Sequence, residues 1–235
     1  MKKIYSLERK KLTNRFLVLL CITILLISGT ATLQAQTISA LVDLPGLLQN
    51  KEIEVFNRNI SPLKDNPQGI HLDAKSGDGV AWIKNSTFKE GTITFDVRGK
   101  DVMQQSFVGM AFHGKNDSTF DVIYFRPFNF QSPDPARKSH AVQYVSLPDW
   151  DWEKLRTQFP GKHENAINPA PSPNEWIHCS IKIKDEMVYV YVNNITEPVL
   201  TVKKISPTIQ GKIGFWVGNN SDGDFANLSV SITKN

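Results

Sequence analysis

Residues 176–184 read Trp-Ile-His-Cys-Ser-Ile-Lys-Ile-Lys, and this stretch decides the fold class. Its apolar side chains alternate with polar ones and share one face: Ile177, Cys179, Ile181 and Ile183. A period of two over such a length is typical of a β-strand with one buried face. The same alternation occurs in residues 92–97 (TITFDV) and 225–233 (FANLSVSIT), so the sequence predicts several half-buried strands.

Four other apolar runs predict strands that are buried on both faces. They are rich in β-branched and aromatic residues and end at Gly, Asn, Asp or Pro: residues 106–114, 120–128, 187–192 and 212–218. Many short strands without a helical period favour two packed sheets. We therefore predict an all-β, two-sheet jelly-roll sandwich formed by one domain.

Residues 127–175 interrupt this succession of short strands, because they hold eight of the 13 prolines. Proline cannot donate to a sheet ladder, so this segment is predicted to leave the sandwich as a long excursion. Within it we predict a strand at residues 141–147 and a short helix at residues 150–159, with Asp149 as the N-cap and Gly161 after the end.

The N-terminus has the organisation of a secretory signal peptide. Six basic residues occur in the first fifteen, twelve mainly apolar residues follow (Phe16–Ile27), and Ala35 is the expected cleavage position. We predict a signal peptide at residues 1–35, a single sandwich domain at residues 36–235, and export to the periplasm or the extracellular space. The alternative is an uncleaved N-terminal anchor, although the apolar run is shorter than a membrane span requires.

Cleavage after Ala35 changes the charge of the chain. Six of the 27 basic residues and one of the 23 acidic residues lie in residues 1–35, which leaves a mature chain of 21 basic and 22 acidic residues. A nearly neutral chain gives no reason to expect nucleic acid or an anionic membrane as a partner, and we expect no membrane span in the mature protein. Of the two cysteines only Cys179 remains, as a packed core thiol without an intramolecular disulfide.

The order of four segments resembles a known family. The segments are FVGMAFHGKNDSTFDVIYFRPFNF, SHAVQYVSLPDW, NEWIHCSIKIKDEMVYVYVNN and GKIGFWVGNNSDGDFANLSV. Together they resemble the 3-keto-disaccharide hydrolase-type domains of the concanavalin A-like lectin and glucanase superfamily, over roughly residues 68–233. The resemblance implies a concanavalin A-like sandwich, a carbohydrate ligand and, for an enzyme, hydrolysis of glycosidic bonds.

The most distinctive candidate site residues lie in the segment from Asp121 to Asn129. As a strand it places Tyr124 and Arg126 on one face, and Pro127 then ends the strand at the sheet rim. A guanidinium fork at that rim can bind sugar hydroxyls or a carboxylate. The alternative is a structural pin, in which Arg126 pairs with Asp121, Asp134 or another acid.

A second group of candidates lies in the excursion: His140, Gln143, Trp150 and Trp152. Aromatic faces beside amide and imidazole groups suit carbohydrate binding. The alternative is that the tryptophans seal the excursion against the sandwich. We predict a ligand site made of seven residues: Tyr124, Arg126, Asn129, His140, Gln143, Trp150 and Trp152.

Catalytic and metal sites are less evident in the sequence. The five histidines form no His-x-His or His-Glu-x-x-His pattern, so we expect no transition-metal site. Residues 219–224 (NNSDGD) are rich in oxygen ligands and resemble a calcium loop only loosely, fitting an Asx-rich turn equally well. We expect no cofactor, and calcium bound at this loop is the alternative.

Three functions stay open on these grounds. The first is an exported protein that binds a glycan or disaccharide on one sheet face. The second is a glycoside hydrolase of the 3-keto-disaccharide hydrolase type, which needs carboxyl groups, or one carboxyl with His140, beside Arg126. The third is a non-catalytic interaction module of the cell envelope.

Overall fold

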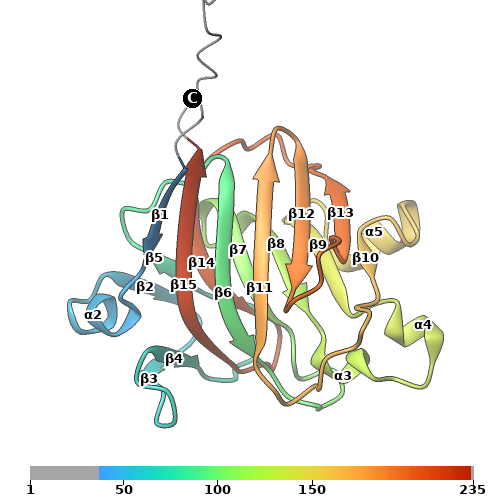
Figure 1. The fold of residues 1–235 in the computed structure, drawn as a ribbon, viewed down its shortest axis with the longest axis horizontal. Helices are drawn as coiled ribbons and strands as arrows, with labels where there is room; N and C mark the ends of the chain where they lie inside the picture. The colour runs from blue at the N-terminus through green and yellow to red at the C-terminus, as the bar shows by residue number, and fades with distance from the viewer. Residues whose placement is uncertain (1–36, 234–235) are drawn as a thin grey trace, which may run out of the picture. The chain divides into compact units, whose positions relative to one another are not determined.

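A computed structural model describes residues 37–233, and the predicted signal peptide lies outside these residues. Two antiparallel sheets pack face to face in this part of the chain (Figure 1). No helix among the described residues has the length and apolar character that a membrane crossing requires.

The first sheet has eight strands. Its spatial order is β13 (Leu200–Lys203), β12 (Met187–Val192), β11 (Ile177–Lys184), β6 (Gly91–Arg98), β15 (Gly223–Thr233), β4 (Gly69–Leu72) and β3 (Ile60–Pro62), and β1 (Thr37–Leu41) also pairs with β15. The alternating segments β6, β11 and part of β15 lie here, each with its apolar face turned inward as predicted.

The second sheet has seven strands. Its order is β10 (Glu164–Asn165), β9 (Val142–Leu147), β8 (Thr119–Phe125), β7 (Val108–Asn116), β14 (Lys212–Val217), β5 (Gly79–Ile83) and β2 (Ile53–Phe56). The central strands β7, β8 and β14 are buried on both faces over most of their length, which explains their continuous apolar sequences. The predicted jelly-roll sandwich is confirmed.

The main core fills the space between the two sheets. Phe95 from the first sheet packs against Phe215 from the second, and Phe215 also packs against Phe225. Cys179 is fully buried in the same core, as predicted, and burial raises the pKa of its thiol.

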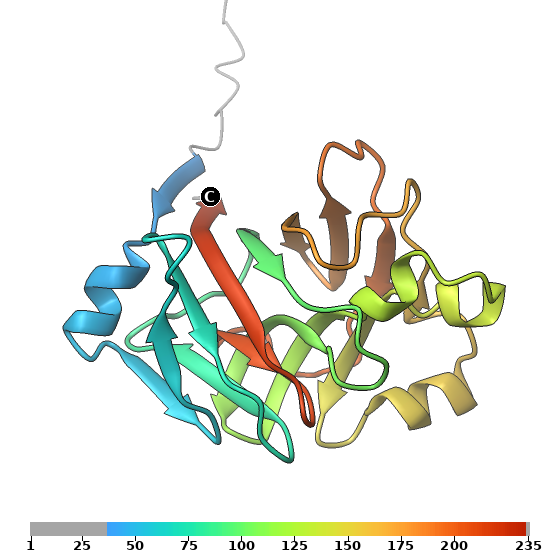
Figure 2. The same ribbon diagram turned by 90° about the horizontal axis from the view of Figure 1, so that it is seen from below.

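Within residues 37–233, four short helices lie at the ends of the sandwich (Figures 1 and 2). One is α2 (Leu44–Gln49), at the end opposite to the excursion, and the other three belong to residues 127–175: α3 (Pro127–Phe130), α4 (Pro135–Lys138) and α5 (Trp152–Gln158). The excursion also contains β9 as predicted, and the two-residue strand β10.

The predicted N-cap of the excursion's helix was wrong. Asp151, not Asp149, caps α5, and its carboxylate accepts a hydrogen bond from the Lys154 backbone N–H at 2.8 Å. Trp150 is not helical, because its backbone exchanges two hydrogen bonds with Ser146 and closes a turn after β9. The helix therefore begins two residues later than the sequence indicated, while Gly161 does follow its end with a φ of 68°.

Candidate functional site

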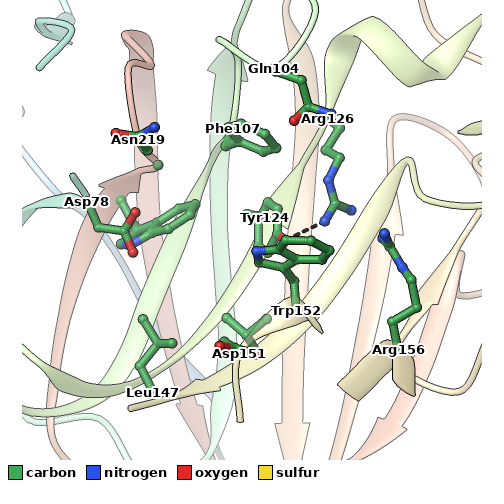
Figure 3. Close-up of a pocket in the computed structure, with 13 residues that line it drawn as sticks. Asp78, Gln104, Phe107, Tyr124, Arg126, Leu147, Asp151, Trp152, Arg156 and Asn219 are labelled. Atoms are coloured by element: carbon green, nitrogen blue, oxygen red, sulfur yellow. Dashed lines mark hydrogen bonds between the residues drawn. The ribbon is translucent and has the colours of Figure 1, made fainter. Parts of the chain in front are cut away.

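A pocket of about 470 Å³ lies on the outer face of the second sheet, the face turned away from the main core. A second apolar cluster forms this face, and Leu155 of α5 packs against it. The pocket is lined by Asp78, Gln104, Phe107, Tyr124, Arg126, Val145, Leu147, Asp151, Trp152, Arg156, Trp216, Gly218 and Asn219. Strands β8, β9 and β14 thus supply its floor, and α5 with several loops supplies its walls (Figure 3).

Aromatic side chains make up much of the pocket surface. Tyr124 and Trp216 lie on neighbouring parts of the floor, with ring centroids 5.1 Å apart, and Phe107 packs edge-on against Tyr124 at 6.2 Å. Trp152 is 48% exposed although it belongs to a packed helix. A large apolar ring left half open beside a pocket is available to stack on a ligand.

Arg126 is held at the rim by three predicted site residues. Its guanidinium donates to the Tyr124 hydroxyl at 2.6 Å, to the Gln143 side-chain carbonyl, and to the His140 backbone carbonyl at 2.9 Å. The Tyr124 hydroxyl in turn donates to Gln143 at 2.9 Å. This arrangement follows from the register of β8 and β9, in which Tyr124 and Gln143 are direct partners.

Glu164 is a buried carboxylate that the sequence analysis missed. It accepts two hydrogen bonds from the Arg156 guanidinium, at 3.0 and 2.7 Å, and its side chain is only 3% exposed. The Nδ1 atom of His140 lies 2.8 Å from Glu164, but outside hydrogen-bond geometry, and the Arg126 guanidinium lies 4.0 Å away. Glu164 belongs to β10, which is too short to give a periodic sequence signal.

Burial sets the protonation of this cluster. It raises the pKa of Tyr124 to about 12, so the phenol keeps its proton and can donate to Gln143. Burial also lowers the pKa of His140 below its ordinary value, which favours the neutral imidazole at pH 7. Burial lowers the pKa of Arg126 as well, but a guanidinium remains charged in proteins.

The opposite side of the pocket carries oxygen acceptors. Figure 3 shows Arg126 and Arg156 on one side, and Asp78 and Asn219 on the other. Asp78 is exposed by surface area, yet it lies in a concave region where protein surrounds it on several sides, and this desolvation raises the pKa of its carboxyl group. The site is therefore polarised, with cations at one end and a carboxylate at the other.

The seven predicted residues separate into three groups. Tyr124, Arg126 and Trp152 line the pocket, while His140 and Gln143 lie behind Arg126 and hold it. The remaining two, Asn129 and Trp150, do not line the pocket.

Both of these residues have other contacts. Asn129 is buried and its amide donates to the His140 carbonyl at 3.4 Å. Trp150 packs against Phe159 and lies under the Lys154 ammonium group. This packing agrees with the alternative in which a tryptophan seals the excursion against the sandwich. Two of the structural-pin partners expected for Arg126 were wrong, because Asp121 accepts from Tyr144 and Asp134 caps α4. The third option, another acid, is met by Glu164, whose carboxylate lies 4.0 Å from the Arg126 guanidinium.

The acidic residues of the 219–224 loop are engaged in ion pairs. Asp222 pairs with Lys100, and Asp224 pairs with both Arg98 and His71. The Asn219 side chain accepts from the Gly77 backbone N–H at 2.7 Å and thereby joins two loops. These contacts are those of a turn fixed by polar bonds, and no group of three His, Cys, Asp or Glu side chains that could hold a metal ion occurs within residues 37–233.

Solved structures share this fold at low sequence identity. No known protein family and no curated protein matches the sequence. A protein of unknown function with a galectin-like fold from Bacillus subtilis has a TM-score of 0.55 and 14% identity, covering 83% of this chain and 96% of its own. The carbohydrate-binding module CBM66 from Bacillus subtilis has a TM-score of 0.54 and 12% identity, covering 76% and 95%.

A third structure is the exoplasmic/lumenal domain of VIP36, in a form bound to Ca²⁺ and Man3GlcNAc. Its TM-score is 0.52 at 8% identity, covering 78% of this chain and 84% of its own. At these identities the comparisons concern the fold alone. The chain has the galectin-like, concanavalin A-like β-sandwich fold.

Proposed function

We propose that this chain is an exported carbohydrate-binding protein, and that its glycan occupies the pocket on the outer face of the second sheet. The observation that carries the proposal is the combination, in one pocket, of open aromatic surface and a buried guanidinium. Trp152 is 48% exposed there, while Arg126 is 5% exposed. Sugar rings present apolar C–H faces together with hydroxyl groups, so they suit such a mixed surface.

The likeness to other proteins supports this proposal by analogy of fold. CBM66 is described as a carbohydrate-binding module, and VIP36 was solved with a mannose-containing glycan.

The test begins with a glycan array probed with the mature chain, followed by calorimetric titration of the best glycan. Arg126→Ala is expected to weaken binding about tenfold or more, because hydrogen bonds to a charged group contribute about 1.5–3 kcal/mol. Lys184→Ala is the control, since Lys184 is exposed on β11 of the first sheet. Because Arg126 also holds Tyr124 and Gln143, Arg126→Lys is measured beside it, with the melting temperature of each variant.

Equal binding by wild type and Arg126→Ala, with both folded, would place the site elsewhere. Export is tested separately by N-terminal sequencing of the secreted protein, which is expected to begin at Gln36. Membrane-bound protein that retains Met1 would contradict export by cleavage.

A second candidate function is glycoside hydrolysis of the 3-keto-disaccharide hydrolase type. Two carboxyl groups, those of Asp78 and Asp151, line the same pocket, and desolvation by the surrounding protein raises the pKa of Asp78. A raised pKa is the direction that a general acid requires. If new reducing ends appear from the bound glycan and Asp78→Asn abolishes them, the protein is a hydrolase. An unchanged glycan after long incubation would leave binding as the function.

A further inference from the structure

The cationic end of the pocket holds more positive than negative charge. Two guanidinium groups, from Arg126 and Arg156, lie near one carboxylate, that of Glu164. Two histidines, His140 and His163, are the other titratable groups near Glu164, and burial lowers the pKa of both, which favours their neutral forms at pH 7. This end of the pocket therefore carries an excess of one positive charge.

The excess charge belongs mainly to Arg126. Glu164 makes both of its hydrogen bonds to Arg156, at 3.0 and 2.7 Å, whereas its closest approach to Arg126 is 4.0 Å. The groups that do receive hydrogen bonds from Arg126 are neutral oxygens, of Tyr124, Gln143 and the His140 backbone. A cation that is 5% exposed ordinarily has a close counter-ion, whereas the carboxylate nearest to Arg126 lies 4.0 Å away and is hydrogen-bonded to Arg156 instead.

Unpaired hydrogen-bond donors accompany this charge. The Gln143 amide nitrogen is buried without a hydrogen-bond partner in the described part of the chain, and so is the indole nitrogen of Trp216 on the pocket floor. Buried donors normally have acceptors, since each one left unpaired costs about 1–3 kcal/mol. Of these two residues, Trp216 lines the pocket and Gln143 lies behind Arg126, so an acceptor oxygen of a ligand would meet the Trp216 indole only.

We propose that the glycan bound in this pocket is an acidic sugar, whose carboxylate lies between Arg126 and Arg156. The inference rests on the proposed carbohydrate-binding function and specifies its ligand class. The planar guanidinium fork matches the two oxygens of a carboxylate. On the opposite side, the Asp78 carboxyl group can accept hydrogen bonds from sugar hydroxyl groups, and its negative charge would repel a second carboxylate there (Figure 3). The acidic sugar is therefore expected to bind with its carboxylate toward the arginines and its hydroxyl groups toward Asp78.

The experiment compares matched acidic and neutral glycans. The probes are hexamers from polygalacturonate, alginate and glucuronan, each paired with its carboxyl-reduced product, and a sulfated galactan hexamer serves as a third arm. At least one acidic hexamer is expected to bind tenfold or more tightly than its reduced partner. Added salt is expected to shrink this preference, because it screens charge.

Arg156→Gln tests the origin of the preference. The Arg156 side chain is 33% exposed, but its loss leaves the buried Glu164 carboxylate without both of its hydrogen bonds, so a melting curve must first show that the variant is folded. The acidic preference should fall at least fivefold in Arg156→Gln and persist in Lys184→Ala. Equal binding of acidic and reduced hexamers, or equal binding of the sulfated galactan, would overturn this inference and leave carbohydrate binding intact. Failure to bind any glycan, on these probes and on the array, would overturn the proposed function itself.

Discussion

Trp152→Ala gives a sharp test of the pocket, because this side chain is exposed and aromatic. A tryptophan buries up to about 250 Å² when fully covered, so a side chain that is 48% exposed offers about 120 Å² to a ligand. A sugar ring covers one face of the indole, or about 60 Å². At about 25 cal/mol per Å², the contact contributes about 1.5 kcal/mol, and its loss weakens binding about tenfold.

The same substitution should barely affect folding. Leu155 keeps α5 anchored on the sheet, and the substitution removes mainly the stacking of the Arg156 guanidinium on the indole, at 5.1 Å from the ring centroid. Phe56→Ala is the matched control, since Phe56 is 44% exposed and lies on β2, outside the pocket. Titration calorimetry with the best array glycan is the assay. If folded Trp152→Ala binds as tightly as Phe56→Ala, the stacking argument is refuted.

Two further predictions concern buried groups on either face of β8. The raised pKa of Tyr124, about 12 against an ordinary 10, gives stability that is complete below pH 10 and is lost as the pH rises from 10 to 12. Denaturant titrations of Tyr124→Phe should therefore show a smaller alkaline loss of stability, by on the order of 2 kcal/mol, and an unchanged loss would contradict the assignment. On the other face, Asp121→Ala leaves Lys204 buried without its carboxylate 3.8 Å away, and should cost about 3–5 kcal/mol while glycan binding is retained. A cost below 1 kcal/mol in the same titrations would show that the pair contributes little.

The sequence predicted those parts of the molecule that depend on local periodicity. The alternation of Ile177, Cys179 and Ile181 indicated a half-buried strand, and the structure confirms it. The shared face of Tyr124 and Arg126 follows from the same period, and Gln143 joins them because β8 and β9 pair with Tyr124 opposite Gln143. The ligand-binding role of these residues stays a prediction.

The rest of the pocket depends on contacts between distant segments. Asp78, Trp216 and Asn219 meet because β5 pairs with β14, an order of strands that no local pattern encodes. The sequence does not indicate Glu164 as a site residue, because a strand of two residues shows no alternation of apolar and polar side chains. Its position in the site also depends on a contact with Arg156, eight residues earlier in the chain. The misplaced helix cap has a similar cause, since the backbone pairing of Trp150 with Ser146 outweighs the capping signal of Asp149.

The most direct test of a glycan site in this pocket follows the indole N–H signals of the five tryptophans by NMR during glycan titration. The Trp216 and Trp152 signals are expected to shift, because both rings line the pocket and the Trp216 donor has no hydrogen-bond partner among the described residues. The Trp176 signal should stay in place, since that ring lies under Arg98 on the first sheet. A titration that shifts Trp176 and leaves Trp152 and Trp216 unchanged would contradict the assignment of the pocket as the glycan site.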